Sequence, residues 1–388
     1  MTRMLASSII EYKNLNKKSR MNYLIEEQQQ LNDLEPLFKN LHESSGVVAV
    51  DTEFLREKTY SAKLCLVQLG IDQNQYCIDV LAIDDLSLLV DLFADEKVLK
   101  LFHAARQDME VIYQTLKVLP KPIFDTQLAS AFCGGDMQQG YGAMVLERTG
   151  IELAKTQSRT DWTRRPLSPE QIEYAGDDVA HLRELYLQTQ AQLELNNRSD
   201  WYQQEIDTFY DVDKYIIDPA MSYQRLSGGN LKIKQQYLLQ ALAEWREVMA
   251  QKRDIPRSWV MRDDKLYDLV MQMPKTEEEI KTLGIFGRKS VVYLAPQALE
   301  IMRNVKAGEE RIWRQVEPLT KNEKKLCSAM MKELTRISEE LGVAQALLGT
   351  RKDVESLYRH RQSKKLLNGW REEHVGQTLL DFVKTQEV

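Results

Sequence analysis

Residues 47–54 read VVAVDTEF, a short run of β-branched and apolar residues that leads into two acids. Such a run predicts a buried β-strand. Side chains at positions i and i+2 of a strand point to the same side, so Asp51 and Glu53 present their carboxylates together. Two like charges at that distance repel each other, and a divalent cation that prefers oxygen ligands would relieve the repulsion. The two acids alone also fit a solvated strand edge.

A third acid, in a second acidic element, lies just beyond a later strand pattern. Residues 98–102 (VLKLF) predict a strand, and a helix is expected over about 105–117. Asp108 then falls in the first turn of that helix, where the helix dipole favours a carboxylate. The dipole by itself would explain this acid, and His103 at the strand end also fits a partly buried structural histidine.

The third acidic element follows a well-defined helix start. Residues 168–171 (SPEQ) place Ser at the N-cap, Pro at N1 and Gln at N3, a capping box that predicts a helix from Pro169 to about residue 196. Tyr174 and Asp178 are four residues apart on that helix and therefore share a face. Tyr174 also fits an ordinary tyrosine that faces the core.

Taken together, the four acids come from three separated segments that can converge on one pocket. Such a set would bind two hard cations through carboxylate oxygens. A two-metal site suits phosphodiester cleavage, in which one ion activates a water and the other stabilises the leaving oxygen. Tyr174, beside Asp178, would orient or deprotonate that water through its hydroxyl.

Composition places the chain among folded proteins. It has 388 residues, 43% hydrophobic and 28% charged, which predicts two or three domains and excludes a wholly disordered chain. No apolar run approaches the ~18 residues that span a bilayer. The cysteines are far apart in sequence, which argues against a disulfide scaffold or a zinc site and for a reducing compartment: Cys65, Cys77, Cys133 and Cys327. The five histidines show no metal-ligand spacing.

Charge is divided unevenly along the chain. Residues 1–230 hold 23 basic and 35 acidic side chains, a net charge of −12, whereas residues 231–388 hold 29 and 23, a net charge of +6. This split suggests different roles for the two parts. A solvated helical domain rich in lysine is the other explanation. The sequence contains no GxxxxGK[ST] P-loop, so the chain is not itself an ATP-driven helicase.

The order of patterns divides the chain into domains. Residues 21–215 alternate strand and helix patterns, typical of an α/β domain with a mixed sheet. Pro219 and the run SGGN indicate a linker over 216–232. Only helices are predicted beyond it, in two small all-α bundles over 233–310 and 318–388. Residues 1–20 show no secretory pattern, and we expect a disordered extension or a start assigned too early, outside the fold.

Three motifs carry a resemblance to a known family: Asp51-x-Glu53, His103-x-Ala105-x-x-Asp108 and Tyr174-x-x-x-Asp178. They resemble the three exonuclease motifs of the DEDDy branch of the DEDD superfamily. This resemblance implies a ribonuclease H-like fold. Further stretches are similar to the bacterial ribonuclease D family: CLVQL at 65–69, FDTQ at 124–127, SRTDW at 158–162 and RPLS at 165–168. Residues 242–246, 266–269 and 283–287 resemble the helicase-and-RNase-D C-terminal (HRDC) domain, and 320–388 resembles the family's second, more divergent helical domain.

The resemblance implies an activity and a set of roles. Asp51, Glu53, Asp108 and Asp178 would bind two divalent ions, Mg or Mn, and Tyr174 would position the attacking water. The implied enzyme is a 3′→5′ exoribonuclease that releases nucleoside 5′-monophosphates and trims the 3′ ends of tRNA precursors. We expect RNA with a free 3′-hydroxyl as its partner, a monomer without an obligate protein partner or membrane contact, and the cytoplasm as its location. A DNA exonuclease and a nucleic-acid-binding scaffold without catalysis are the alternatives.

The sequence also suggests residues that would contact the substrate. In the nuclease part these are Thr52, Phe54, Gln68, His103 and Arg165. In the basic part, Lys321, Lys324, Lys325 and Lys332 form a stripe at near-helical spacing, and Arg361 belongs to a second basic cluster. From these two groups we name Lys325 and Arg361 as RNA contacts, with a solvated face as the other interpretation. Trp162 fits either base stacking or core packing, and core packing is the expectation we prefer.

Overall fold

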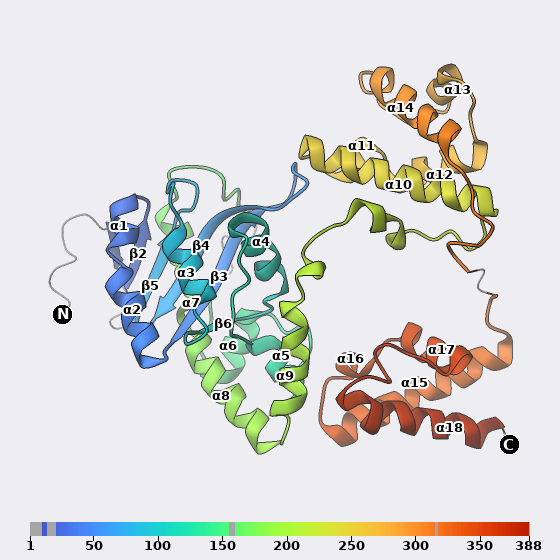
Figure 1. Cartoon of the computed structure of the whole chain (residues 1–388). Coiled ribbons are helices and arrows are strands. Elements are labelled where there is room, and N and C mark those ends of the chain that lie inside the picture. Colours follow the sequence, from blue (N-terminus) through green and yellow to red (C-terminus); the bar gives the residue numbers. More distant parts are fainter. Residues whose placement is uncertain (1–9, 14–20, 155–159, 315–316, 388) are drawn as a thin grey trace. The chain divides into compact units, whose positions relative to one another are not determined.

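A computed structural model describes residues 10–13, 21–154, 160–314 and 317–387. The chain divides into two compact units (Figure 1). Of the described residues, those within Met1–Leu55, Leu64–Val212 and Leu319–Val388 form unit 1, and those within Arg56–Lys63 and Asp213–Pro318 form unit 2. Ser158 and Arg159 of the SRTDW motif lie outside the described residues.

A mixed sheet forms the centre of unit 1, as predicted. Among the described residues it has seven strands in the order β1-β2-β5-β4-β3-β6-β7 (Figure 1). The strands are β1 (Ile10–Lys13), β2 (Met21–Ile25), β3 (Val47–Leu55), β4 (Lys63–Ile71), β5 (Asn74–Ile78), β6 (Leu99–Phe102) and β7 (Ile123–Asp125). β3, β6 and β7 run parallel, as do β2 and β5, whereas β1–β2 and β4–β5 are antiparallel.

The helices of the nuclease part flank this sheet. They are α1 (Gln28–Asn32), α2 (Glu35–Ser44), α3 (Ser87–Ala94), α4 (Arg106–Leu116), α5 (Thr126–Ala131), α6 (Tyr141–Thr149), α7 (Pro169–Ala180), α8 (Leu182–Leu195), α9 (Ser199–Asp207) and the 3-10 helix η1 (Thr208–Tyr210). α7 packs on β2, β3 and β5. A Cβ at Gly70 of β4 would lie only 3.0 Å from the Val179 carbonyl oxygen, so this glycine allows α7 to lie close to the sheet.

At the edge of the sheet, the structure corrects the expectation that residues 1–20 lie wholly outside the fold. Residues 10–13, which we placed outside the fold, form β1 and pair with β2 from Ile10 opposite Leu24 to Lys13 opposite Met21. The strand β2 itself lacks a strong alternating pattern and was not predicted. β1 occupies the outer side of β2, where backbone N–H and C=O groups would otherwise be unpaired. Residues 1–9 and 14–20 lie outside the described residues.

The predicted single helix over 169–196 is also wrong at one point. Its start is confirmed, because the Ser168 hydroxyl accepts from the Gln171 N–H at 3.3 Å and the Ser168 N–H donates to Gln171 Oε1 at 2.9 Å. The helix is interrupted at His181, whose φ and ψ of −113° and −1° separate α7 from α8. The physical cause is a tyrosine hydroxyl from α6 that enters the hydrogen-bond ladder there.

The C-terminal helices belong to unit 1. They are α15 (Lys321–Leu341), α16 (Gln345–Leu348), α17 (Arg351–His360), the π-helical turn η4 (Glu372–Gly376) and α18 (Gln377–Glu387). They pack against the nuclease part: the Trp370 ring stacks on Trp201 of α9 at 4.4 Å, and the Ala344 N–H donates to the Ala131 carbonyl at 2.8 Å. The bundle is therefore anchored to α5 and α9 by both apolar and polar contacts.

Unit 2 is helical and has its own core. Its helices are η3 (Pro219–Arg225), α10 (Ile233–Arg253), α11 (Arg257–Val260), α12 (Asp263–Gln272), α13 (Glu277–Thr282) and α14 (Val291–Asn304), preceded by η2 (Val212–Lys214). Leu242, Leu266 and Leu294 are buried between them. The segment between β3 and β4 joins this unit, and the Tyr60 hydroxyl donates to buried Glu247 at 2.5 Å. The predicted boundaries at 215, 232, 310 and 318 stay predictions.

Two further expectations from composition can be compared with the structure. All four cysteines are free thiols among the described residues. Within the same described ranges, every helix is too short or too polar to cross a lipid bilayer.

Candidate active site

Three of the predicted acids meet at the centre of the nuclease sheet. Asp51 and Glu53 lie on β3, and Asp178 lies near the end of α7, which packs on that strand. One carboxylate oxygen from each of the three lies within 4.8 Å of the other two. The described residues contain no other such group of acidic, histidine or cysteine side chains. Three converging carboxylates of this kind offer hard oxygen ligands to a divalent cation.

The fourth acid, Asp108, is buried in the first turn of α4 and lies outside this group of three. Its Oδ1 accepts a 2.5 Å hydrogen bond from the Thr52 hydroxyl, which lies on β3 between the two strand acids. Asp108 is nevertheless close enough to raise the pKa values of Asp51 and Glu53. The structure therefore brings all four acids into one electrostatic cluster, with Asp108 held to one side by Thr52.

Burial and mutual repulsion dominate the protonation of this cluster. Burial, followed by the charges of the other three acids, raises the pKa of Asp51 well above its ordinary value. Burial raises the pKa of Glu53 to about 9, with Asp178 and Asp108 adding to it, and raises the pKa values of Asp108 and Asp178 to about 7. No cationic side chain is among the main causes of these pKa shifts. The residues present therefore fit a divalent cation, which would supply the missing positive charge and displace the protons.

Tyr174 lies on the same face of α7 as Asp178, next to the carboxylate cluster. Its hydroxyl interacts with the Asp178 carboxylate and lowers the pKa of that acid, against the larger effect of burial. Burial and then the charge of Asp178 raise the pKa of this hydroxyl, so it stays protonated at neutral pH. Its ring lies 6.3 Å from that of Trp162, which is 3% exposed and packs with Leu66 and Ile172. Core packing of Trp162 is thus confirmed.

The predicted substrate contacts in the nuclease part lie in different environments. His103 is half-buried, and its Nε2 donates to the Gln139 carbonyl at 2.8 Å. Gln68 is fully buried, and its side-chain oxygen and nitrogen have no hydrogen-bond partner among the described residues. Phe54 is half-buried at the end of β3. Substrate contact by these residues, and by Thr52, stays a prediction.

Arg165 is engaged by the protein itself. Its guanidinium pairs with buried Asp79, donating to Oδ1 at 2.7 Å and also to Oδ2. The same group donates to the carbonyls of Cys65 at 3.1 Å and Trp162 at 2.7 Å. A phosphate would have to compete with these partners, so contact between Arg165 and the substrate stays a prediction.

Asp125 belongs to the FDTQ stretch at 124–127, but its structural role was not predicted. Asp125 ends β7 and caps α5, accepting from the N–H groups of Gln127 at 2.9 Å and Leu128 at 3.1 Å. Its carboxylate also accepts from the N–H groups of Ala104 at 3.1 Å and Ala105 at 2.9 Å. Asp125 therefore fixes the turn that leads into α4 and Asp108. Its position after a strand and before a helix was a usable N-cap signal.

Comparison with known proteins agrees with this geometry. Residues 23–194 match the family model described as 3′-5′ exonuclease, and residues 235–310 match that of the HRDC domain. The ribonuclease D of Bartonella henselae is 33% identical over 378 residues, which cover 96% of this chain and 92% of the relative. That of Nitrobacter hamburgensis is 36% identical over 341 residues, with coverage of 86% and 89%.

A solved structure extends the likeness to three dimensions. The crystal structure of Escherichia coli ribonuclease D, described as an exoribonuclease involved in structured RNA processing, matches with a TM-score of 0.83 at 27% identity, covering 93% of this chain and 98% of that one. The sheet, the carboxylate cluster and the matched family model define a 3′–5′ exonuclease. More specifically, the chain belongs to the ribonuclease D family. It is accordingly a hydrolase of the 3′–5′ exoribonuclease type.

Proposed function

We propose that the protein removes nucleotides one at a time from a free 3′-hydroxyl end of RNA by two-metal hydrolysis and releases nucleoside 5′-monophosphates. The observation that carries this proposal is the convergence of Asp51, Glu53 and Asp178 within 4.8 Å. These three carboxylates would hold one Mg²⁺ or Mn²⁺ ion, and Asp108 with Asp51 would contribute to a second. When bound, such ions lower the pKa of a water and neutralise charge on the phosphate.

Tyr174 is suited to orient the attacking water rather than to deprotonate it. Burial and the charge of Asp178 raise the pKa of its hydroxyl, which disfavours the phenolate that a general base would need. The hydroxyl oxygen still has a lone pair, which would accept a hydrogen bond from the water. Orientation of a nucleophile in this way lowers the entropic part of the barrier.

For RNA binding outside the nuclease centre, we propose the lysine row on α15. Exposed lysines, with Ser328 and Ala329, line a shallow hollow of about 420 Å³ there: Lys321, Lys324, Lys325 and Lys332. No acidic side chain lines this hollow. The row therefore carries positive charge that RNA phosphates can neutralise, with release of counterions. Lys325 belongs to this surface, and Arg361, exposed at the end of α17, extends the proposal to the same bundle.

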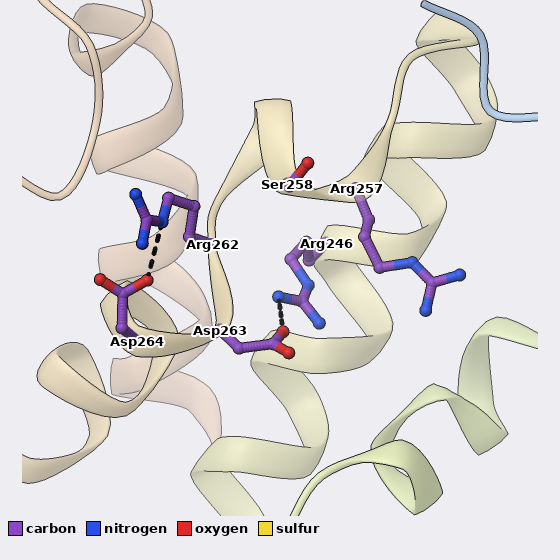
Figure 2. Close-up of a pocket in the computed structure, with 6 residues that line it drawn as sticks. All are labelled: Arg246, Arg257, Ser258, Arg262, Asp263 and Asp264. Atoms are coloured by element: carbon purple, nitrogen blue, oxygen red, sulfur yellow. Dashed lines mark hydrogen bonds and ion pairs between the residues drawn. The ribbon is translucent and has the colours of Figure 1, made fainter. Parts of the chain in front are cut away.

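An arginine-lined hollow of about 320 Å³ in unit 2 is a weaker candidate. Arg246 pairs with Asp263 and Arg262 pairs with Asp264 (Figure 2). The N···O distances of these two ion pairs are 2.5 and 3.0 Å. Arg257 in turn lies 3.5 Å from buried Glu247. Each guanidinium already faces a carboxylate, so a phosphate bound there would have to compete for it.

We further propose tRNA precursors with 3′ extensions as the natural substrate and the cytoplasm as the place of action. The relative from Escherichia coli, which is described as acting in structured RNA processing, supports this choice. A tRNA precursor has a structured body, which could contact the lysine row. Its single-stranded 3′ end could enter the carboxylate site and lose one nucleotide at a time.

The test is a tRNA precursor labelled at its 5′ end, incubated with Mg²⁺ or with EDTA. We expect stepwise shortening from the 3′ end only with metal, and nucleoside 5′-monophosphates on chromatography of the products. A matched 3′-phosphorylated RNA should resist cleavage. Equal rates on DNA of the same sequence would instead support the DNA exonuclease, and binding without shortening would support the inactive scaffold.

A further inference from the structure

A tyrosine hydroxyl lies within the backbone ladder at the end of α7. The Tyr141 hydroxyl donates to the Asp177 carbonyl oxygen at 3.1 Å, and the His181 N–H donates to the Tyr141 oxygen at 3.0 Å. In an uninterrupted α-helix the His181 N–H would bond directly to the Asp177 carbonyl, four residues earlier. The hydroxyl therefore bridges a helical hydrogen bond that has opened, and Asp178 lies directly at the opening.

Tyr141 is itself held in place by the second exonuclease motif. Its ring packs edge-on against that of His103, with centroids 5.6 Å apart. The His103 Nε2 donates to the Gln139 carbonyl at 2.8 Å, and the Gln127 side-chain amide donates to the same oxygen at 2.9 Å. Tyr141 is the first residue of α6 and follows this anchored segment. His103 and Gln127 thus fix the point from which the tyrosine reaches α7.

The hydroxyl lies close to the carboxylate cluster. Burial raises the pKa of Tyr141 well above its ordinary value, and the charges of Asp178 and Asp51 add to the shift. The hydroxyl is therefore protonated and available as a donor to Asp177. The last turn of α7 lacks one direct bond of its own ladder, so its orientation depends on the bridging hydroxyl as well as on the helix.

We propose that Tyr141 is a positioning residue for the exonuclease reaction, and that its hydroxyl, anchored through His103, sets the orientation of the last turn of α7 and of the Asp178 carboxylate. Tyr141 acts through Asp178 and contacts no substrate. The inference rests on the proposed role of Asp178 in metal binding. It also gives His103 a role in positioning in place of the predicted substrate contact.

The test compares four full-length proteins: wild type, Tyr141→Phe, Tyr210→Phe and Asp178→Asn. Tyr210→Phe is the matched control, because the Tyr210 hydroxyl also accepts from a backbone N–H, that of Ile123 at 3.0 Å, but its electrostatic neighbours lie outside the cluster. For each protein, Mn²⁺ affinity is measured without RNA, and kcat and KM are measured with RNA. Urea unfolding gives the stability of each.

For Tyr141→Phe we expect about 10-fold weaker Mn²⁺ binding and about 10-fold lower kcat, with KM for RNA within about twofold of wild type. Tyr210→Phe should lose stability to a similar extent and keep both Mn²⁺ affinity and kcat. Wild-type Mn²⁺ affinity and kcat in Tyr141→Phe, or equal losses in Tyr210→Phe, would overturn the inference. If Asp178→Asn kept its Mn²⁺ affinity, the proposed metal site would fail first, and the inference with it.

If Tyr141→Phe does not fold, a second variant, His103→Phe, tests the same positioning role. His103→Phe retains an aromatic ring against Tyr141 and removes the hydrogen bonds of the imidazole with the Gln139 carbonyl and the Thr126 hydroxyl. We expect lower kcat and weaker Mn²⁺ binding, smaller than in Tyr141→Phe, at unchanged KM. A raised KM with unchanged Mn²⁺ affinity would instead show that His103 contacts the substrate and would contradict its place in the positioning network.

Discussion

The Thr52 hydroxyl donates a 2.5 Å hydrogen bond to the carboxylate of Asp108, and both side chains are buried. This bond joins the strand that carries Asp51 and Glu53 to the helix that carries the fourth acid. It stabilises the charged form of Asp108 against the burial that raises its pKa. The orientation and the protonation of Asp108 are therefore both linked to β3.

Thr52→Val tests this link. Removal of a hydrogen bond to the charged form raises the pKa of Asp108 further above about 7. At limiting Mn²⁺, activity should fall several-fold more at pH 6.5 than at pH 8.5, because the protonated carboxyl cannot hold a cation. Thr52→Ser, which keeps the hydroxyl, should retain the wild-type pH profile. Parallel profiles for the valine variant and wild type would show that the bond has no such effect.

Asp178→Asn should separate stability from catalysis. We expect about 10³-fold lower activity, because one of three converging carboxylates is lost. In EDTA at pH 8 the variant should be at least as stable as wild type, since removal of a charge relieves repulsion in the cluster. Exonuclease assays and thermal unfolding measure the two effects. Residual activity near wild type would remove Asp178 from the site.

Tyr174→Phe should lower turnover without weakening RNA binding. The variant keeps the ring beside Trp162 and loses the hydroxyl that lowers the pKa of Asp178. Because that hydroxyl would act on the attacking water, kcat should fall about 10²-fold while KM stays within about twofold. Steady-state kinetics on a labelled oligoribonucleotide decide the matter, and a change confined to KM would point to substrate binding instead.

The metal-free protein should lose stability as pH rises. Folding raises the pKa of Glu53 from 4.5 to about 9 and those of Asp108 and Asp178 from 3.8 to about 7. The folded chain thus binds more protons than the unfolded chain between about pH 4 and 9, so the free energy of unfolding decreases with pH across that window.

The same linkage predicts how metal acts on stability. Mn²⁺ must displace the bound protons, and fewer remain at higher pH, so the rise in Tm on adding Mn²⁺ should be larger at pH 8.5 than at pH 6. Thermal unfolding with Mn²⁺ or with EDTA, at pH 6 and at pH 8.5, measures this rise in Tm. A rise in Tm that is independent of pH would mean that the ion binds away from these carboxylates.

Gly70→Ala tests how closely α7 must lie on the sheet. The added Cβ would lie 3.0 Å from the Val179 carbonyl oxygen and 3.1 Å from the Ala49 Cβ, so α7 or β3 must shift. We expect a loss of about 1–3 kcal/mol in the free energy of unfolding, together with lower kcat. Gly142→Ala in α6, where the nearest atom lies 4.0 Å away, is the control and should be neutral or stabilising. Urea unfolding of both variants measures the difference.

The site was predictable from sequence wherever the signal was local. VVAVDTEF placed two acids on a buried strand, and the Ser168–Gln171 capping box fixed the start of the helix that carries Tyr174 and Asp178. Strand and helix periodicity fixed which side chains share a face, Asp51 with Glu53 and Tyr174 with Asp178, whereas their convergence on one site was an expectation that rested on the combined motifs. The helices of the basic half were likewise indicated by their amphipathic patterns and by Gly and Pro punctuation.

The features that escaped prediction depend on partners distant in sequence. β2 is a strand because it pairs with β5, about fifty residues later, and with β1. The break at His181 requires a hydroxyl from Tyr141, forty residues earlier, which no local pattern in 169–196 could reveal. Asp108 lies outside the group of three acids, and its hydrogen-bond partner Thr52 comes from another element, fifty-six residues earlier.

The most direct test of the account is anomalous diffraction from crystals grown with Mn²⁺ and a nucleoside 5′-monophosphate. We predict Mn²⁺ peaks within bonding distance of the Asp51, Glu53 and Asp178 carboxylate oxygens, with the nucleotide phosphate beside them. Mn²⁺ bound elsewhere, with these three carboxylates turned away from one another, would contradict the account.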